Sequence, residues 1–118
     1  MDKFYSGNNL DIYCGDCLDI LPGLPDKSVD LVFTSPPFNL GGNHHTGNYR
    51  HRPYDDCIPE QEYQDWQLKV LDELYRVVKD KGSCWYQHKN RIKDGVSITP
   101  YLWLLKSKWP QEQQIWHY

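Results

Sequence analysis

The stretch DLVFTSPPFNLGG, from Asp30 to Gly42, decides the fold that this sequence predicts. Its first part, 31–34, is apolar or β-branched, which favours a strand buried on both faces, as in a parallel sheet. Ser35 and two consecutive prolines follow the strand. Because proline fixes φ and has no N–H, the pair predicts a rigid corner that presents its carbonyl groups outward.

Strand and helix signals alternate on both sides of this corner. The predicted elements are strands at 10–14, 29–35, 83–88 and 113–118, helices within 16–24 and at 59–82 and 99–108, and a long loop at 39–58. Such alternation predicts an α/β layer with a mostly parallel sheet and flanking helices.

The helix predicted at 59–82 has the clearest pattern. Pro59 suits its first turn, and Gly82 suits a C-terminal cap. One apolar face is predicted, with members three and four residues apart: Tyr63, Trp66, Val70, Leu74 and Val77. Trp85 and Trp103 are expected in the core.

Length and composition fit one small globular domain of 118 residues with a net charge of −3. No apolar run approaches the length of a membrane span, and the first residues show no secretion signal, so we expect a cytoplasmic protein without a membrane partner. Two basic stretches, 44–52 and 88–93, interrupt the acidic background. They predict either solvated loops or contacts with nucleic-acid phosphates.

The cysteines allow more than one interpretation. Cys14 and Cys17 form a C-x-x-C, which suits a redox dithiol, half of a zinc site or two small apolar side chains. Neither Cys57 nor Cys84 belongs to a second such pair. We therefore predict no metal site. Asp55 and Asp56 could coordinate a cation, but a solvated turn is the favoured interpretation.

The corner itself has a chemical interpretation beside that of a plain turn. In open α/β sheets, ligands bind beyond the carboxyl ends of the strands. The Ser35 hydroxyl and the proline carbonyls are acceptors that could hold an exocyclic amine, while the Phe38 ring stacks on a base. Holding a poorly nucleophilic amine in a reactive geometry is a way to accelerate its reaction.

Several phrases, taken in order, resemble one enzyme family. They are Gly15-Asp16, Ser28-Val29-Asp30-Leu31, Ser35-Pro36-Pro37-Phe38, the phrase RVVKDKGS at 76–83, HKN at 88–90 and QQIWHY at 113–118. Together they resemble the amino-methylating DNA methyltransferases of bacteria and phages, which modify cytosine N4 or adenine N6. The sequence departs from the family phrase at Lys81, where a glycine is usual.

The resemblance implies a partial Rossmann-like fold and transfer of a methyl group from S-adenosyl-L-methionine (AdoMet) to a flipped base in double-stranded DNA, as in restriction-modification. Ser35, Pro36, Pro37 and Phe38 would be catalytic: Ser35 and the Pro36 carbonyl would bind the amine, and Phe38 would stack on the base. Asp16, Thr34 and Ser35 would contact AdoMet, with no metal. A serine in the first motif position favours cytosine N4 over adenine N6.

The basic side chains nearest these motifs are the expected DNA contacts. They are Arg50, Arg52, Lys89 and Arg91. The alternative from another functional class is a DNA-binding remnant without catalysis.

The resemblance also implies that 1–118 is the N-terminal catalytic half of a domain. The Phe-x-Gly-x-Gly loop that binds AdoMet in the family, and the target-recognition region, are not found in it. We therefore expect weak or no methyl transfer by this chain alone, and an apolar sheet face left exposed. A truncated gene, a split enzyme with a complementary chain, and a remnant remain open.

Overall fold

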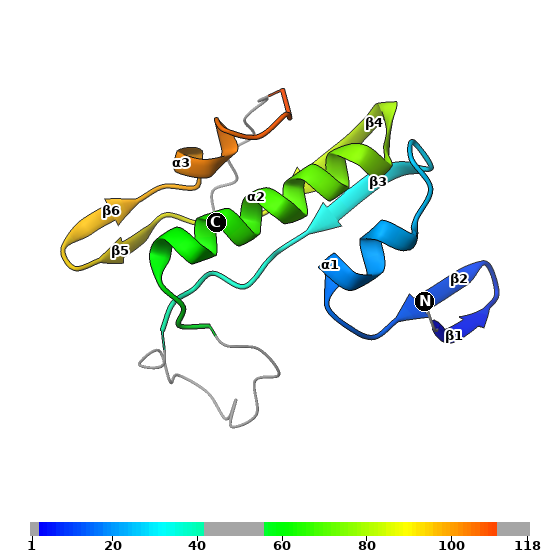
Figure 1. The fold of residues 1–118 in the computed structure, drawn as a ribbon, viewed down its shortest axis with the longest axis horizontal. Helices are drawn as coiled ribbons and strands as arrows, with labels where there is room; N and C mark the ends of the chain where they lie inside the picture. Colours follow the sequence, from blue (N-terminus) through cyan, green and yellow to red (C-terminus); the bar gives the residue numbers. More distant parts are fainter. Residues whose placement is uncertain (1–2, 42–55, 111–118) are drawn as a thin grey trace.

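The computed structural model describes residues 3–41 and 56–110 (Figure 1). The elements in chain order are β1 (Lys3–Gly7), β2 (Leu10–Tyr13), α1 (Cys17–Ile20), the 3₁₀ turn η1 (Leu21–Gly23), β3 (Val29–Thr34), α2 (Glu60–Val77), β4 (Val78–Tyr86), β5 (Arg91–Lys93), β6 (Val96–Ile98) and α3 (Tyr101–Leu104). The strand predicted at 113–118 lies outside the described residues.

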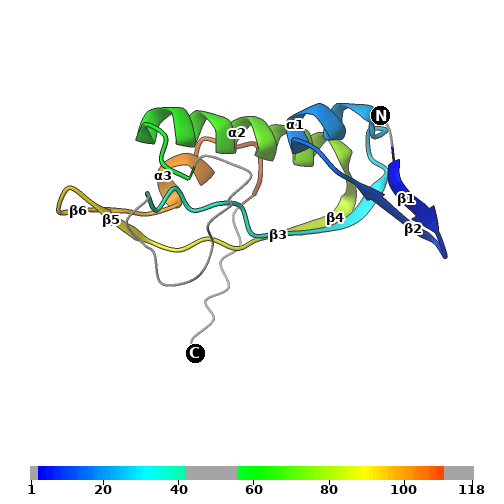
Figure 2. The ribbon, with the colours of Figure 1, turned by 90° about the horizontal axis from the view of Figure 1, so that it is seen from below.

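The centre of the molecule is a β-α-β unit made of β3, α2 and β4. The two strands are parallel, with Val32 paired to Cys84 and Thr34 to Tyr86. Parallel neighbours need a crossover connection, and α2 provides it. Figure 2 shows α1 and α2 on the same side of these strands. The predicted α/β arrangement is therefore present here, with the Pro-Pro corner at the carboxyl end of β3.

The other two strand pairs are antiparallel hairpins, so a mostly parallel sheet is not confirmed in the described part of the chain. The turn between β1 and β2 uses Asn8 and Asn9, with φ of 52° and 60°. The turn between β5 and β6 uses Asp94 and Gly95, with φ of 51° and 75°. Two consecutive positive φ angles match the twist of a tight hairpin, which explains why these segments fold back locally.

Helix α2 ends at Val77, five residues before the predicted cap at Gly82. The chain enters β4 directly, and Gly82 lies within that strand. A Cβ atom on Gly82 would lie 2.6 Å from Val78 Cγ1 and 2.8 Å from the Asp30 carbonyl oxygen. The glycine is thus required for the close approach of β4 to β3, and the prediction that it caps the helix is wrong.

The core lies between α2, α3 and the β5–β6 hairpin. Its buried members are Tyr63, Leu71, Ile98 and Trp103. The prediction for Trp103 is confirmed, because its side chain is fully buried. Trp85 is 38 % exposed, so the same prediction for Trp85 is wrong.

One face of the β3–β4 sheet is apolar and exposed. Leu31, Phe33 and Trp85 are 57 %, 76 % and 38 % exposed, and the register pairs Phe33 with Trp85. The prediction that β3 is buried on both faces is therefore wrong for the described chain, because α2 covers only one face. The expectation of an exposed apolar sheet face is met. Among the described residues, no helix is both long enough and apolar enough to cross a bilayer.

Candidate functional site

The Pro-Pro corner begins where the β3–β4 ladder ends. At the end of β3, the Thr34 carbonyl oxygen accepts a hydrogen bond from the Gln87 N–H at 2.8 Å. Ser35 is exposed, and Pro36 and Pro37 are half-buried. No described residue hydrogen-bonds the Ser35 hydroxyl or the Pro36 carbonyl. These two acceptors are therefore available to a ligand.

The second proline of the corner is held by an internal hydrogen-bond chain. The Tyr63 hydroxyl donates to the Pro37 carbonyl oxygen at 2.6 Å and lies 2.7 Å from His88 Nε2. The Lys89 N–H donates to His88 Nδ1 at 2.9 Å. Because the single hydroxyl proton of Tyr63 goes to Pro37, His88 Nε2 must carry a proton and donate to Tyr63.

His88 is held as a neutral imidazole in this chain. Burial, with the positive charges of Arg91 and Lys89, lowers its pKa to about 4. The Lys89 carbonyl oxygen, 2.8 Å from Nδ1, and the Glu60 carboxylate act in the opposite direction. Burial also raises the pKa of the Tyr63 hydroxyl well above its usual value. Both groups therefore keep their protonation state at neutral pH, and the corner is fixed by neutral hydrogen bonds.

Phe38 lies beside this chain rather than in it. Its ring centroid is 4.9 Å from that of His88, and Lys89 Nζ is 5.7 Å from the Phe38 ring centroid. Lys89 is exposed. The structure therefore places a cation and an aromatic ring together at the outer side of the corner.

A pocket of about 200 Å³ lies at the inner side of the corner. It is enclosed by the end of β3, α2, α1 and the end of β4, and its lining is formed by Cys17, Thr34, Ser35, Pro36, Pro37, Trp66, Gln67, Val70 and Tyr86. Phe38 is not part of this lining. The predicted site residues 34–37 thus meet at one pocket, while Phe38 faces His88.

Hydrogen bonds of Asn39 hold the chain after Phe38 in place. Asn39 is buried and has a φ of 54°. Its side chain makes two bonds to the backbone of Ile58, each 2.9 Å, and its N–H donates to Asp56 Oδ1 at 2.8 Å. The Gly41 N–H donates to the Asp56 carbonyl at 2.8 Å. Asp56 is 9 % exposed, so the prediction of a solvated turn there is wrong.

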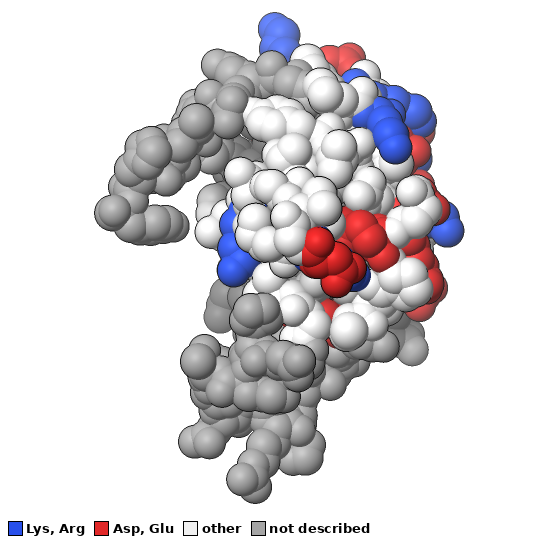
Figure 3. All heavy atoms as spheres, turned by 90° about the vertical axis from the view of Figure 1, so that its left-hand side faces the viewer, with Lys and Arg blue, Asp and Glu red and all other residues white. Residues whose placement is uncertain are grey.

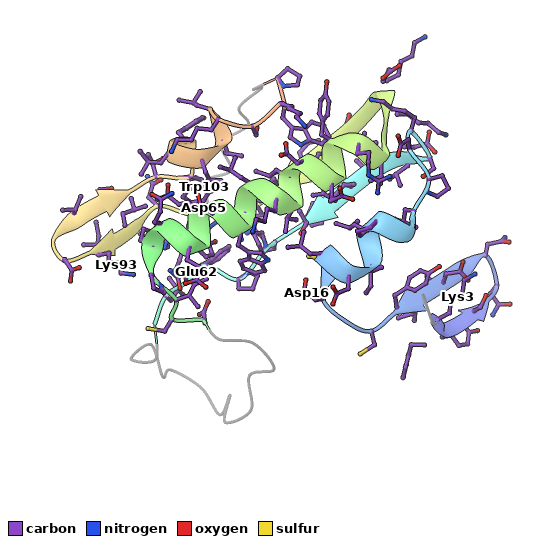
Figure 4. The ribbon with its side chains drawn as sticks, viewed as in Figure 1. Lys3, Asp16, Glu62, Asp65, Lys93 and Trp103 are labelled. Atoms are coloured by element: carbon purple, nitrogen blue, oxygen red, sulfur yellow. The ribbon has the colours of Figure 1, made fainter. Side chains whose placement is uncertain are left out.

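Asp16 stands at the start of α1, next to the pocket residue Cys17 (Figure 4). Asp16 is exposed, and its Oδ1 atom accepts the Leu18 N–H at 2.8 Å, which caps α1. Burial and the Asp16 carboxylate raise the pKa of the Cys17 thiol. A raised pKa makes the thiolate scarcer, which disfavours the redox interpretation of the C-x-x-C.

The four predicted DNA contacts are in different situations. Arg50 and Arg52 lie outside the described residues. Arg91 is 5 % exposed and binds Glu60 through both terminal nitrogens, at 2.9 and 2.7 Å. Its guanidinium is thus used inside the fold, and of the two described residues only Lys89 is exposed. Figure 3 shows acidic and basic side chains on the side with the β5–β6 hairpin, and its described part is not uniformly basic.

Comparison with known proteins adds the family to this geometry. A family model described as DNA methylase matches residues 29–118, which include the corner, α2 and β4. The chain belongs to this N6/N4 DNA methylase family. Among curated relatives, it is 35 % identical over 89 residues to the type II methyltransferase M.BglII of Bacillus subtilis, covering 75 % of this chain and 22 % of that protein.

Two further relatives of the DNA methylase family show the same pattern of short coverage. The type II methyltransferase M.BamHI of Bacillus amyloliquefaciens is 37 % identical over 76 residues, which are 61 % of this chain and 16 % of the relative. The DNA adenine methyltransferase YhdJ of Escherichia coli K12 is 36 % identical over 74 residues, which are 60 % of this chain and 22 % of the relative. The chain spans about a fifth of the length of these relatives.

Three polar groups at the corner and its pocket were not predicted from the sequence. Tyr63 was expected only as an apolar helix residue, yet its hydroxyl holds Pro37. His88 was expected only as part of a basic stretch. Gln67, 1 % exposed, was not singled out. Gln67 could have been identified from the sequence, because it lies one turn after Tyr63 on the buried side of the helix. A buried amide needs a hydrogen-bond partner, which indicates a polar site nearby.

Proposed function

We propose that this chain provides the amine-binding corner of an AdoMet-dependent DNA amino-methyltransferase. The observation that supports this most is a pair of acceptors, the Ser35 hydroxyl and the Pro36 carbonyl, that have no hydrogen-bond partner among the described residues. Both residues line one pocket beyond the end of a parallel strand. Family membership and the names of the relatives agree with this proposal. We propose the catalytic roles of Ser35, Pro36 and Pro37 on this basis. The stacking role predicted for Phe38 draws no support from this pocket, because Phe38 is not part of its lining.

In the proposed reaction, the corner orients the amine of a flipped base. The two acceptors take one hydrogen bond each from the amine, so that the nitrogen lone pair points away from them. Bound AdoMet would supply an electrophilic methyl group on its sulfonium. As the N–C bond forms and positive charge develops on the amine, the hydrogen bonds to Ser35 and Pro36 strengthen, which lowers the barrier. The sulfur of the donor would leave as a neutral thioether, and the surplus amine proton would pass to water. The bond from Tyr63 to Pro37 keeps the corner rigid during this step.

The residues near the pocket fit a methyl donor that contains adenosine, such as AdoMet. Asp16 carries an exposed carboxylate beside Cys17, and carboxylates accept hydrogen bonds from ribose hydroxyls or ring amines. Thr34 and Ser35 line the same pocket. We propose Asp16, Thr34 and Ser35 as AdoMet contacts, and Lys89 as a contact to DNA phosphate.

Cytosine N4 is the proposed target atom, with adenine N6 as the alternative. The serine in the first motif position supports cytosine. One relative carries the name of an adenine methyltransferase, so membership of the family does not select the base. Digestion of methylated DNA to nucleosides, followed by mass spectrometry, separates the two: N4-methylcytosine is expected, and N6-methyladenine alone contradicts the choice.

The remainder of the methyltransferase domain is proposed to pack on the apolar face formed by Leu31 and Phe33. This face is exposed in the described chain, although sheets with parallel strands are normally covered on both sides. We propose that the covering part carries the Phe-x-Gly-x-Gly loop, either on a longer chain or on a complementary one.

The test is methyl transfer from tritiated AdoMet to mixed-sequence duplex DNA. The chain is assayed alone and together with the part of M.BglII that lies beyond its matched region. We expect strong labelling only for the pair, and about a 100-fold loss with Ser35→Ala. Ser97→Ala, an exposed serine in β6, is the matched control and should retain activity.

Two results would contradict the proposal. Labelling that is unchanged by Ser35→Ala would remove the corner from catalysis. Salt-dependent DNA binding that survives Ser35→Ala and Phe38→Ala, without any affinity for AdoMet, would instead indicate a DNA-binding protein without catalysis.

A further inference from the structure

Gln67 is a buried polar residue with an unsatisfied group at the pocket. It lies in the middle of α2, is 1 % exposed and lines the pocket beside the corner. Its Nε2 atom has no hydrogen-bond partner among the described residues. Buried amide donors are nearly always paired in native proteins, and leaving one unpaired costs about 1–3 kcal/mol. A ligand in the pocket is a candidate partner.

The orientation of the Gln67 amide follows from its neighbours. Trp103 Nε1, which can only donate, donates to the Tyr86 hydroxyl at 3.1 Å. The Tyr86 hydroxyl then gives its proton to Gln67 Oε1 at 2.6 Å. This relay therefore occupies the oxygen of Gln67. The nitrogen, with two protons, is left as a donor that cannot act as an acceptor.

We propose that Gln67 is a specificity-determining residue that donates a hydrogen bond to the ring nitrogen next to the exocyclic amine of a bound nucleobase. This inference rests on the proposed function, because it takes the amine to be held by Ser35 and Pro36. Cytosine and adenine both place a ring acceptor beside an amine donor. The residues that line the pocket include groups of the complementary kind, acceptors at the corner and an amide donor on α2.

The size and polarity of the pocket define the ligand class. Its volume of about 200 Å³ is below the roughly 300–1,000 Å³ of sites for drug-sized ligands, which suits a single heterocycle. Uracil and thymine have the reverse pattern, with a carbonyl oxygen beside a ring N–H. They would set a carbonyl against the Pro36 carbonyl and an N–H against the Gln67 amide. Amino bases are thus accepted and oxo bases rejected.

Two ligands have an exocyclic amine beside a ring nitrogen acceptor: the target base of DNA and the adenine ring of AdoMet. The experiment is a titration of the full ¹⁵N-labelled chain, followed through the side-chain amide signals of its glutamines by NMR. The probes are AdoMet, cytidine, adenosine, uridine, 3-deazacytidine, 1-deazaadenosine and a short duplex with cytosine opposite an abasic site. The two deaza compounds keep the amine but lack the adjacent ring acceptor.

We expect the Gln67 signals to shift with amino bases and to shift much less with uridine and the deaza compounds. Gln64 is a control within the same spectrum, because it is buried on α2 but its Nε2 atom already donates to Glu60 at 3.0 Å. A shift with AdoMet but not with the duplex identifies the cofactor ring, and the opposite result identifies the target base. Gln67 signals that no probe moves overturn the proposal.

Gln67→Glu provides the second measurement, since it keeps an acceptor for Tyr86 and removes the donor. We expect about a tenfold loss of affinity for the amino base and loss of discrimination against the deaza compound. Wild-type affinity and discrimination in Gln67→Glu, with Ser35→Ala still giving about a 100-fold loss of methyl transfer in the paired assay, overturn this inference while the proposed function stands. If Gln67→Glu does not fold, the wild-type titration decides alone.

Discussion

The Tyr63 hydroxyl donates to the Pro37 carbonyl oxygen across 2.6 Å, which joins α2 to the corner at the end of β3. The two residues are 26 positions apart in the chain. The bond occupies the Pro37 carbonyl and leaves the Pro36 carbonyl without a described partner. Tyr63 therefore determines which carbonyl of the corner faces a ligand.

Replacing Tyr63 by phenylalanine should destabilise the chain by about 1–3 kcal/mol, because the Pro37 carbonyl and His88 Nε2–H both lose their partner. Urea unfolding followed by tryptophan fluorescence measures this change. The control is Tyr75→Phe on the same helix, since Tyr75 is 37 % exposed and its hydroxyl has no described hydrogen-bond partner. Equal unfolding midpoints for the two variants would contradict the role given to Tyr63.

Stability should fall as the pH is lowered from about 6.5 to about 4. The pKa of His88 is lowered to about 4 in the folded chain, whereas the unfolded residue titrates near its ordinary 6.5. In this window the unfolded state binds a proton that the folded state does not, so protonation favours unfolding. Urea midpoints at pH 7 and pH 4.5 give the size of the effect.

His88→Gln separates this contribution from that of the carboxylates, because glutamine can still donate to Tyr63 but does not titrate. The variant should lose less stability than the wild type between pH 7 and pH 4.5. The same loss in both proteins would show that His88 is not the group responsible.

Gly82→Ala should destabilise the β3–β4 pair by about 1–3 kcal/mol, because its Cβ would lie 2.8 Å from the backbone oxygen of Asp30. A backbone atom cannot move away as a flexible side chain can. Ser83→Ala, at the next and exposed position, should change stability by less than about 0.5 kcal/mol. Thermal unfolding by circular dichroism compares the two, and a neutral Gly82→Ala would contradict the close approach.

Lys89 and Arg91 should respond to substitution in opposite ways. Lys89→Ala should weaken DNA binding and reduce the slope of log affinity against log salt by about 1, with little effect on stability. Arg91→Lys should leave that slope unchanged and lower the urea midpoint, because lysine cannot make the paired contact to Glu60. Fluorescence anisotropy at several salt concentrations measures the slopes. If Arg91→Lys changed the slope and Lys89→Ala did not, Arg91 rather than Lys89 would be the DNA contact.

The β-α-β centre could be predicted from the sequence because its signals are local. The apolar run before Ser35 and the periodic helix after Pro59 each specify their own element, and a helix between two strands implies parallel pairing. The position of the corner beyond a strand end followed directly. Thr34 to Pro37 line one pocket there, whereas Phe38 and Asp16, which the sequence also singled out, are not part of its lining.

The remaining features depend on contacts that a linear pattern does not contain. Gly82 after a lysine-rich helix end is typical of a cap, but the early turn into β4 is set by packing against Asp30. The hairpin at Asp94-Gly95 does carry a local signal, because Asp-Gly is a common turn pair, and it directly follows the basic stretch 88–93. The directions of the Tyr63 hydroxyl and the Gln67 amide depend on partners far along the chain.

The hydrogen bonds around Asn39 have a consequence for protein engineering. Asn39 and Gly41 are bonded to Asp56 and Ile58, so positions 39–41 and 56–58 are joined directly by hydrogen bonds. The entropy of closing a loop rises only slowly with its length. Exchanging the residues from 42 to 55 for an unrelated linker should leave the corner intact, which makes this position a natural graft point for new sequence-reading elements.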